Sequence, residues 1–165
     1  AVPNPTPTSK EDEKKYSEII TMKVRKKPAR VLMFCNAPSR DFQFLLTQLL
    51  RDQADVCLVV QNEGGSSGRI NLLEDPNRQL VKFPDRLIKE EDDSQKSDPK
   101  EKWYNLAMYD VIIAFDPDWN QLSGDQISKL RTWVEINAGG LMFIAGPQYT
   151  KFLGRPDDAN KMNPL

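Results

Sequence analysis

Four short apolar runs stand out along the chain and divide it into regular blocks. They cover residues 30–35, 56–60, 111–115 and 141–145, and none of them alternates between apolar and polar side chains. Continuous apolar runs of this length are typical of parallel strands that are buried on both faces. The chain is therefore expected to build its core around a mostly parallel sheet.

Two helices are predicted between these runs. Residues 39–52 carry phenylalanine and leucine at helical spacing, with Ser39 as the N-cap. Ser123 and Gln126 form a capping-box pair at the start of the second helix. The apolar residues that follow on this helix are Ile127, Leu130, Trp133 and Val134. A strand, a helix and a strand at this spacing predict a right-handed parallel βαβ unit.

These elements predict an α/β fold of three layers, a flavodoxin-like, mostly parallel sheet with helices on both faces. Residues 29–153 are expected to form the domain. Residues 1–28 are expected to be a disordered tail followed by the end strand of a preceding β domain or a linker. Residues 62–68 predict a flexible loop, residues 86–102 a charged surface insertion, and residues 154–165 a polar tail.

Composition and charge narrow the range of functions. The 165 residues are 28% charged with a net charge of −1, so nothing global favours nucleic acid or an anionic membrane. No apolar run approaches the roughly 20 residues of a membrane helix. The proline-rich, polar start is not expected to be a signal peptide. The chain has no histidine, which excludes histidine-dependent catalysis within it.

The two cysteines, Cys35 and Cys57, lie in apolar strand candidates. Free buried thiols are the simplest interpretation, because free cysteine behaves as a small hydrophobic residue. A disulfide between neighbouring strands stays open, since it depends on geometry. Two cysteines without histidine make a poor zinc site, so neither a metal nor a cofactor is expected.

Ligands of open parallel sheets bind beyond the carboxyl ends of the strands, and this rule singles out three turns. The candidate binding residues in them are Asn36, Ser39, Arg40, Asp116, Asp118, Gly146 and Gln148. Each also has a purely structural interpretation. Ser39 suits a helix cap and Arg40 a surface charge. The two aspartates suit either an acid or metal-ligand pair, or backbone hydrogen bonding in a proline-bearing turn.

Several sequence blocks follow one another in an order that is similar to a known family. They are residues 30–34, 37–40, 42, 44–45, 83–84, 109–113, 122–123, 130, 133–134 and 139–147. Together, over about residues 20–150, they resemble the class I glutamine amidotransferase-like fold. The resemblance is closer to the version found in large bacterial membrane-anchored proteins with von Willebrand factor A modules. It implies a soluble domain of such a protein, with the periplasmic side favoured, that follows an immunoglobulin-like β domain.

The resemblance also bears on activity. Active amidotransferases carry a cysteine in a G-x-C-x-G turn after a strand, with a histidine and an acid later in the chain. Here Ala145 or Gly146 stands where the thiol should be. The main hypothesis is a non-catalytic interaction or ligand-binding module. Its partners would be other domains of the same polypeptide or envelope proteins, and its ligand a small molecule or sugar.

Two alternatives stay open. One is a carbohydrate-binding or hydrolytic relative of the trehalose-utilisation-type family. The other is an enzyme that uses Asp116 and Asp118 with a metal ion.

Overall fold

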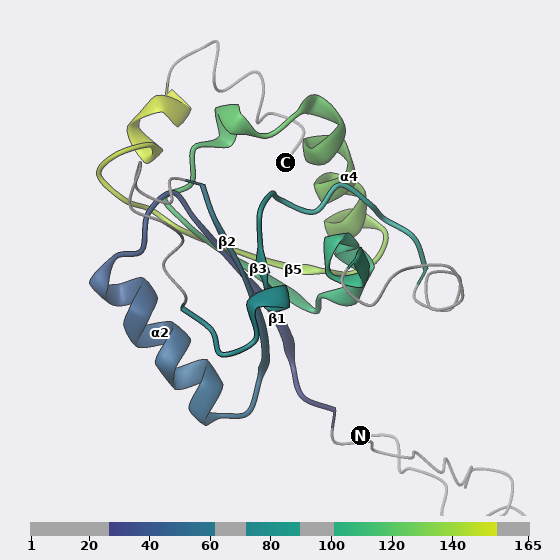
Figure 1. The fold of residues 1–165 in the computed structure, drawn as a ribbon. Coiled ribbons are helices and arrows are strands. Elements are labelled where there is room, and N and C mark those ends of the chain that lie inside the picture. The colour runs from purple at the N-terminus through teal and green to yellow at the C-terminus, as the bar shows by residue number, and fades with distance from the viewer. Residues whose placement is uncertain (1–26, 62–71, 90–100, 155–165) are drawn as a thin grey trace, which may run out of the picture.

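The computed structural model describes residues 27–61, 72–89 and 101–154, and its centre is a parallel sheet (Figure 1). The strands are β1 (Arg30–Cys35), β2 (Asp55–Val60), β3 (Gln79–Leu80), β4 (Val111–Phe115) and β5 (Gly140–Ile144). They lie in the order β3-β2-β1-β4-β5, and every neighbouring pair is parallel. The predicted α/β fold is thus confirmed. The chain first builds outward from β1 to β3 and then returns to β4, so β1 and β4 form the switch point of the sheet.

Two α-helices are present in the described residues, and both begin as the sequence predicts. Helix α2 (Arg40–Arg51) has Ser39 as its N-cap, which accepts a hydrogen bond from the Phe42 N–H at 3.1 Å. Helix α4 (Gly124–Glu135) starts with a complete capping box between Ser123 and Gln126. Five 3₁₀ segments connect these elements, at Pro76–Arg78, Glu101–Tyr104, Leu106–Met108, Trp119–Gln121 and Thr150–Gly154.

The two helices cover opposite faces of the sheet, with α2 on one side and α4 on the other (Figure 1). Successive side chains of each strand therefore enter two different cores. The core under α2 contains Val31, Met33, Cys35, Phe42, Leu46, Val56, Leu58, Val60, Ile113 and Phe115. The larger core under α4 contains Leu32, Phe34, Cys57, Val59, Ile112 and Ala114 from the strands, with Ile127, Leu130 and Trp133 from the helix. This two-sided burial explains why the strands read as continuous apolar runs.

The structure differs from the sequence prediction at three places. Strand β3 was not predicted, because it has only two residues and pairs with β2 alone among the described strands. Strand β5 was predicted to be buried, but Met142 and Phe143 are 53% and 40% exposed. Part of the predicted insertion also has regular contacts, because Arg86 forms a parallel bridge with Asn105.

Other expectations lie outside the described residues. These are the end strand of a preceding β domain, expected at residues 18–26, the loop at residues 62–68, and residues 155–165 of the polar tail. Within the described ranges, no helix is long and apolar enough to cross a membrane.

Candidate functional site

Hydrogen bonds join the three turns that the sequence singled out at the carboxyl edge of the sheet. The Asn36 side-chain Nδ2 donates to the Gln148 Oε1 at 3.0 Å, across 112 residues of sequence. The Gln148 backbone N–H donates to the Asp116 carboxylate at 2.7 Å. The Gly146 N–H donates to the Thr150 hydroxyl at 2.8 Å. Asn36, Asp116, Gly146 and Gln148 therefore meet, as expected for turns that follow β1, β4 and β5.

Asp116 is the centre of this group. Its carboxylate accepts the backbone N–H groups of Gln148, Tyr149 and Thr150 and also the Thr150 hydroxyl, at 2.7–3.0 Å. Burial raises the pKa of this carboxyl, but these hydrogen bonds outweigh burial and hold the pKa below its usual value. Four donors leave the carboxylate little capacity for a metal ion or a substrate proton. The geometry thus favours backbone hydrogen bonding for Asp116.

Gly146 is required by the same contact. A Cβ at this position would lie 2.5 Å from the Cβ and Oδ2 atoms of Asp116. Asp116 itself has a φ of 39°, a left-handed conformation that aspartate tolerates better than most residues. The turn after β4 and the turn after β5 are therefore packed directly against each other.

The other candidate residues have local roles in the turns and helix starts where they lie. Ser39 caps α2, and Arg40 is an exposed residue in its first turn. The Asp118 side chain caps the 3₁₀ segment Trp119–Gln121, where its carboxylate accepts the Asn120 N–H at 3.1 Å. Asp116 and Asp118 thus serve different partners. No group of three or more acidic or cysteine side chains suited to a metal occurs in the described residues.

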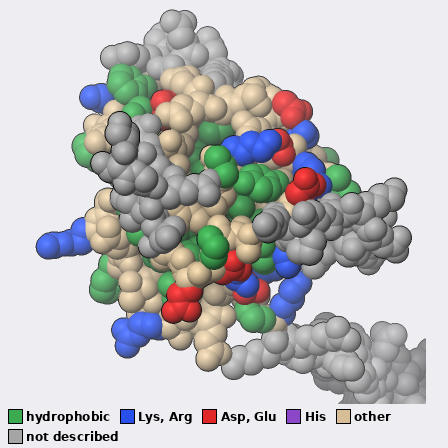
Figure 2. All heavy atoms as spheres, in the orientation of Figure 1, with side chains coloured by type: hydrophobic (Ala, Val, Ile, Leu, Met, Phe, Trp, Pro, Cys, Tyr) green, Lys and Arg blue, Asp and Glu red, His purple; other side chains and the backbone are tan. Residues whose placement is uncertain are grey.

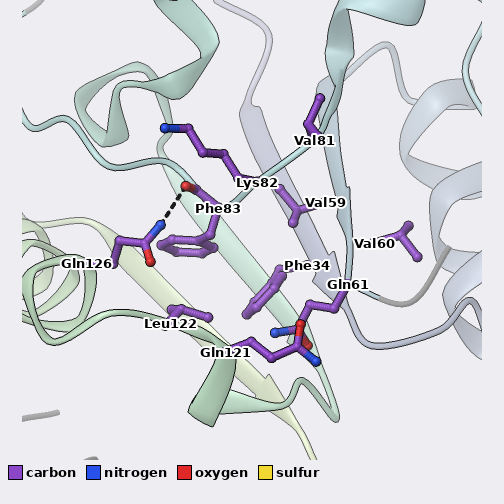
Figure 3. A pocket seen from close by; sticks show the side chains of 10 residues that line it. All are labelled: Phe34, Val59, Val60, Gln61, Val81, Lys82, Phe83, Gln121, Leu122 and Gln126. Carbon is purple, nitrogen blue, oxygen red and sulfur yellow. Dashed lines mark hydrogen bonds between the residues drawn. The ribbon is translucent and has the colours of Figure 1, made fainter.

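A pocket of about 290 Å³ opens beside these turns, on the face of the sheet that α4 covers (Figure 3). Its lining residues are Phe34, Val59, Val60, Gln61, Val81, Lys82, Phe83, Gln121, Leu122 and Gln126. The floor is buried and apolar, and the Phe34 and Phe83 rings meet there with centroids 4.9 Å apart. Exposed Val81, Lys82 and Gln121 surround the opening. An apolar floor with a few polar groups is the usual form of a small-molecule site.

Three glutamines supply most of the polar groups of the pocket. The Gln61 amide is fixed in both directions, because its Nε2 donates to the Asp118 carbonyl at 2.8 Å and its Oε1 accepts the Asp118 N–H at 2.7 Å. The Gln126 Nε2 donates to the Phe83 carbonyl at 2.8 Å, and its Oε1 accepts the Ser123 N–H. The Gln121 Nε2 donates to the Asp118 carboxylate at 3.3 Å. These bonds hold the amides in place before any ligand arrives.

Charge around the pocket is balanced. Lys82 is the only charged residue among the described residues of its lining, and it pairs with Asp85. It also borders a neighbouring pocket of about 300 Å³, lined by Lys82, Asp85, Arg86, Glu101 and Tyr104. Acidic and basic side chains are interspersed over the face of the molecule shown in Figure 2. This distribution gives no single-sign field for a highly charged ligand on that face.

The cysteines are free and buried, and they lie on opposite faces of the sheet. This arrangement excludes a bridge between them. Burial raises the pKa of the Cys35 thiol to about 12 and that of Cys57 to about 11. Thiols with such pKa values are poor nucleophiles at neutral pH, because they carry almost no thiolate.

The sequence prediction named the turns that meet at the carboxyl edge of the sheet, and it named none of the residues that line the pocket. Gln61 directly follows β2, so the strand-end rule would have included it. In the sequence Gln126 carries the signal of a capping residue, and Phe83 belongs to one of the blocks that resemble the known family. Lys82 and Gln121 carry no local sequence signal of a binding site.

Comparison with known proteins identifies no relative. No family model matches the chain, and neither the curated proteins nor the solved structures contain a significant match.

Proposed function

We propose that this domain is a non-catalytic module that binds a small, uncharged, hydrogen-bonding molecule in the pocket between β1, β2 and the start of α4. The observation that carries the proposal is the lining itself, with two aromatic rings on a buried floor and three oriented glutamine amides. A volume of about 290 Å³ lies just below the roughly 300–1,000 Å³ range of ligand pockets. The ligand would therefore be of monosaccharide size or smaller.

The chemistry of the lining supports an uncharged ligand. Amides donate and accept hydrogen bonds without carrying charge, and the Lys82 ammonium group at the rim is already paired with Asp85. Burying a charged ligand here would leave its charge without a free partner, which is costly. A ligand with hydroxyl or amide groups on one side and an apolar side against the rings would match the lining.

Three features support the non-catalytic part of the proposal. Ala145 or Gly146 stands where the resembled family carries its nucleophilic thiol, and the chain has no histidine. Cys35 and Cys57 are buried with raised pKa values. The Asp116 carboxylate is occupied by backbone and hydroxyl donors, which disfavours the metal-dependent alternative. Membership of a larger cell-envelope protein, with neighbouring domains as partners, rests on the resemblance alone and is part of the same proposal.

The experiment is a thermal-stability screen against a panel of monosaccharides and small amides. A ligand that binds only the folded state raises Tm in a concentration-dependent way. Gln121→Trp, at the exposed rim, should block the opening and abolish the shift. Gln43→Trp, the same change on the exposed side of α2, should leave it intact.

Three results would overturn the proposal or one of its parts. Ligand binding is refuted when no member of the panel stabilises the protein, or when the Gln121→Trp variant responds like the wild type. The non-catalytic assignment fails when the purified protein hydrolyses glutamine or another amide above the rate in buffer.

A further inference from the structure

Strand β5 forms one end of the described sheet, and its outer edge pairs with no other described strand. Two of its apolar side chains, Met142 and Phe143, are exposed. Met142 lies in register with Ile113 on the α2 side, and Phe143 with Ala114 on the α4 side. Strands β1 and β4 have similar sequences, but almost all of their residues are buried. The sequence of β5 therefore suits an interior strand better than an edge.

The edge also lacks the usual protection against pairing. Exposed edge strands are normally blocked by lysine, proline or a bulge. Here the whole segment from Ile136 to Thr150 has no charged residue, in a chain that is 28% charged. The nearest charges in sequence are Glu135 and Lys151, beyond both ends of the strand. Nothing electrostatic along β5 opposes the approach of an identical strand.

The hydrogen bonds to β4 determine which groups of β5 face outward. The Gly140 N–H donates to the Asp110 carbonyl, and the Ile144 carbonyl accepts the Asp116 N–H. In a parallel ladder the groups of alternate residues point to the same neighbour. Residues 140, 142 and 144 therefore face β4, and the N–H and C=O groups of Leu141 and Phe143 point to the open edge.

We propose that a second copy of this chain pairs antiparallel with β5, with the two-fold axis at Met142. Leu141 then lies opposite Phe143 of the second copy, and the two residues exchange both backbone hydrogen bonds. The symmetric pair does the same, which gives four hydrogen bonds. The two sheets join into one continuous sheet, and a two-fold operation uses the same edge on both copies.

The side chains are complementary in this register, which favours a second copy as the occupant. Phe143 and Leu141 form an aromatic–aliphatic cross-strand pair on the α4 side. On the α2 side Met142 meets its own copy, and the small Gly140 lies opposite the larger Ile144. All of these pairs are uncharged, and the register that pairs the outward-facing backbone groups is the same register that matches the side chains. The proposal does not depend on ligand binding in the pocket.

The register can be tested by a disulfide between copies. Met142 would form a non-hydrogen-bonded pair, in which the two Cα atoms lie about 4.5 Å apart, within the range of disulfides. Mild oxidation of Met142→Cys should give a covalent dimer of twice the 18.9 kDa chain mass. Phe44→Cys, at a residue of α2 that is 74% exposed, is the matched control and should stay mostly monomeric. Equal cross-linking of the two variants would overturn the proposal.

Association itself is measured by sedimentation from micromolar to millimolar concentration. The wild type and Phe44→Lys should dimerise, and Met142→Lys or Met142→Glu alone should lose at least tenfold in affinity, because like charges would face each other across the axis. A mixture of the two charged variants should recover the dimer. Circular dichroism verifies folding, which the 53% exposure of Met142 favours. A wild type that is monomeric throughout, or charged variants that dimerise like it, would refute the pairing.

Discussion

Removal of the Asp116 carboxylate should destabilise the domain more than removal of any other candidate site side chain. The carboxylate accepts four hydrogen bonds, from Gln148, Tyr149 and Thr150. A net value of about 1 kcal/mol for each bond, reduced because water can reach some of the freed N–H groups, gives about 2–4 kcal/mol. Alanine at a φ of 39° adds about 1 kcal/mol of backbone strain. The expected loss for Asp116→Ala is therefore about 3–5 kcal/mol.

Two variants separate the contributions. Asp116→Asn keeps one acceptor oxygen and the tolerance for a left-handed backbone, so it should lose about 1–2 kcal/mol. Asp118→Ala is the matched control two residues away. Among the described residues its carboxylate accepts the Asn120 N–H and a 3.3 Å bond from Gln121, and a loss of about 1 kcal/mol is expected. The assay is the free energy of unfolding in urea.

The pH dependence gives an independent check. The folded-state pKa of Asp116 lies below its ordinary value of 3.8, so its contribution is present above about pH 4. This contribution is lost as pH falls through the folded-state pKa, and the Asn variant should lack that part of the acid transition. The reasoning is refuted when Asp116→Ala lies within about 1 kcal/mol of the wild type or costs no more than Asp118→Ala.

Three further predictions concern helix α4, the helix caps and the buried strands that support the site. Gly139→Ala should lower the free energy of unfolding in urea by about 3 kcal/mol or more, because its Cβ would lie 2.2 Å from the buried Trp133 ring. Gly124→Ala is the control and should be nearly neutral or stabilising, because a Cβ there would meet no atom within 4 Å. Ser123→Ala should lower the free energy of unfolding by about 1–2 kcal/mol, because it breaks a reciprocal capping box. Ser39→Ala removes a simpler cap and should lower it by less, so equal losses would contradict this ranking. Cys35 and Cys57 should react with a thiol reagent only at the rate of unfolding, and rapid labelling of the native protein at pH 7 would refute their burial. Burial raises the pKa of the two thiols from 9.0 to about 12 and about 11. Their contribution to the free energy of unfolding should therefore be complete below pH 9 and be lost as pH rises through these values.

Local signals explain why much of the fold could be predicted from the sequence. Ser39, Ser123 and Gln126 act within three residues of their own position, so their caps are readable without tertiary structure. The apolar runs are equally direct, because a parallel strand buried on both faces needs a continuous run. Strand β3 escapes this reasoning because two residues form no periodic pattern.

The candidate site was predicted only in part because its contacts are long-range. The strand-end rule correctly brings Asn36, Asp116 and Gln148 to one edge. It cannot show that Asp116 is used by the backbone of residues 148–150, since that depends on how the turn after β5 folds back. The pocket depends in the same way on the segment around Phe83, which lies over β1 and hydrogen-bonds to Gln126 of α4.

The carboxyl edge of the sheet therefore has two parts, the hydrogen-bonded turns around Asp116 and the pocket beside Gln61, and the turn after β4 connects them. In the first part the Asp116 carboxylate binds the turn after β5, and in the second the Asp118 backbone hydrogen-bonds to the Gln61 side chain. A change at Asp116 should reduce stability and could weaken ligand binding only through this turn. A change at Gln121 should reduce binding with little loss of stability, because its side chain is at the exposed rim. Variants at the two positions thus distinguish the support of the site from the site itself.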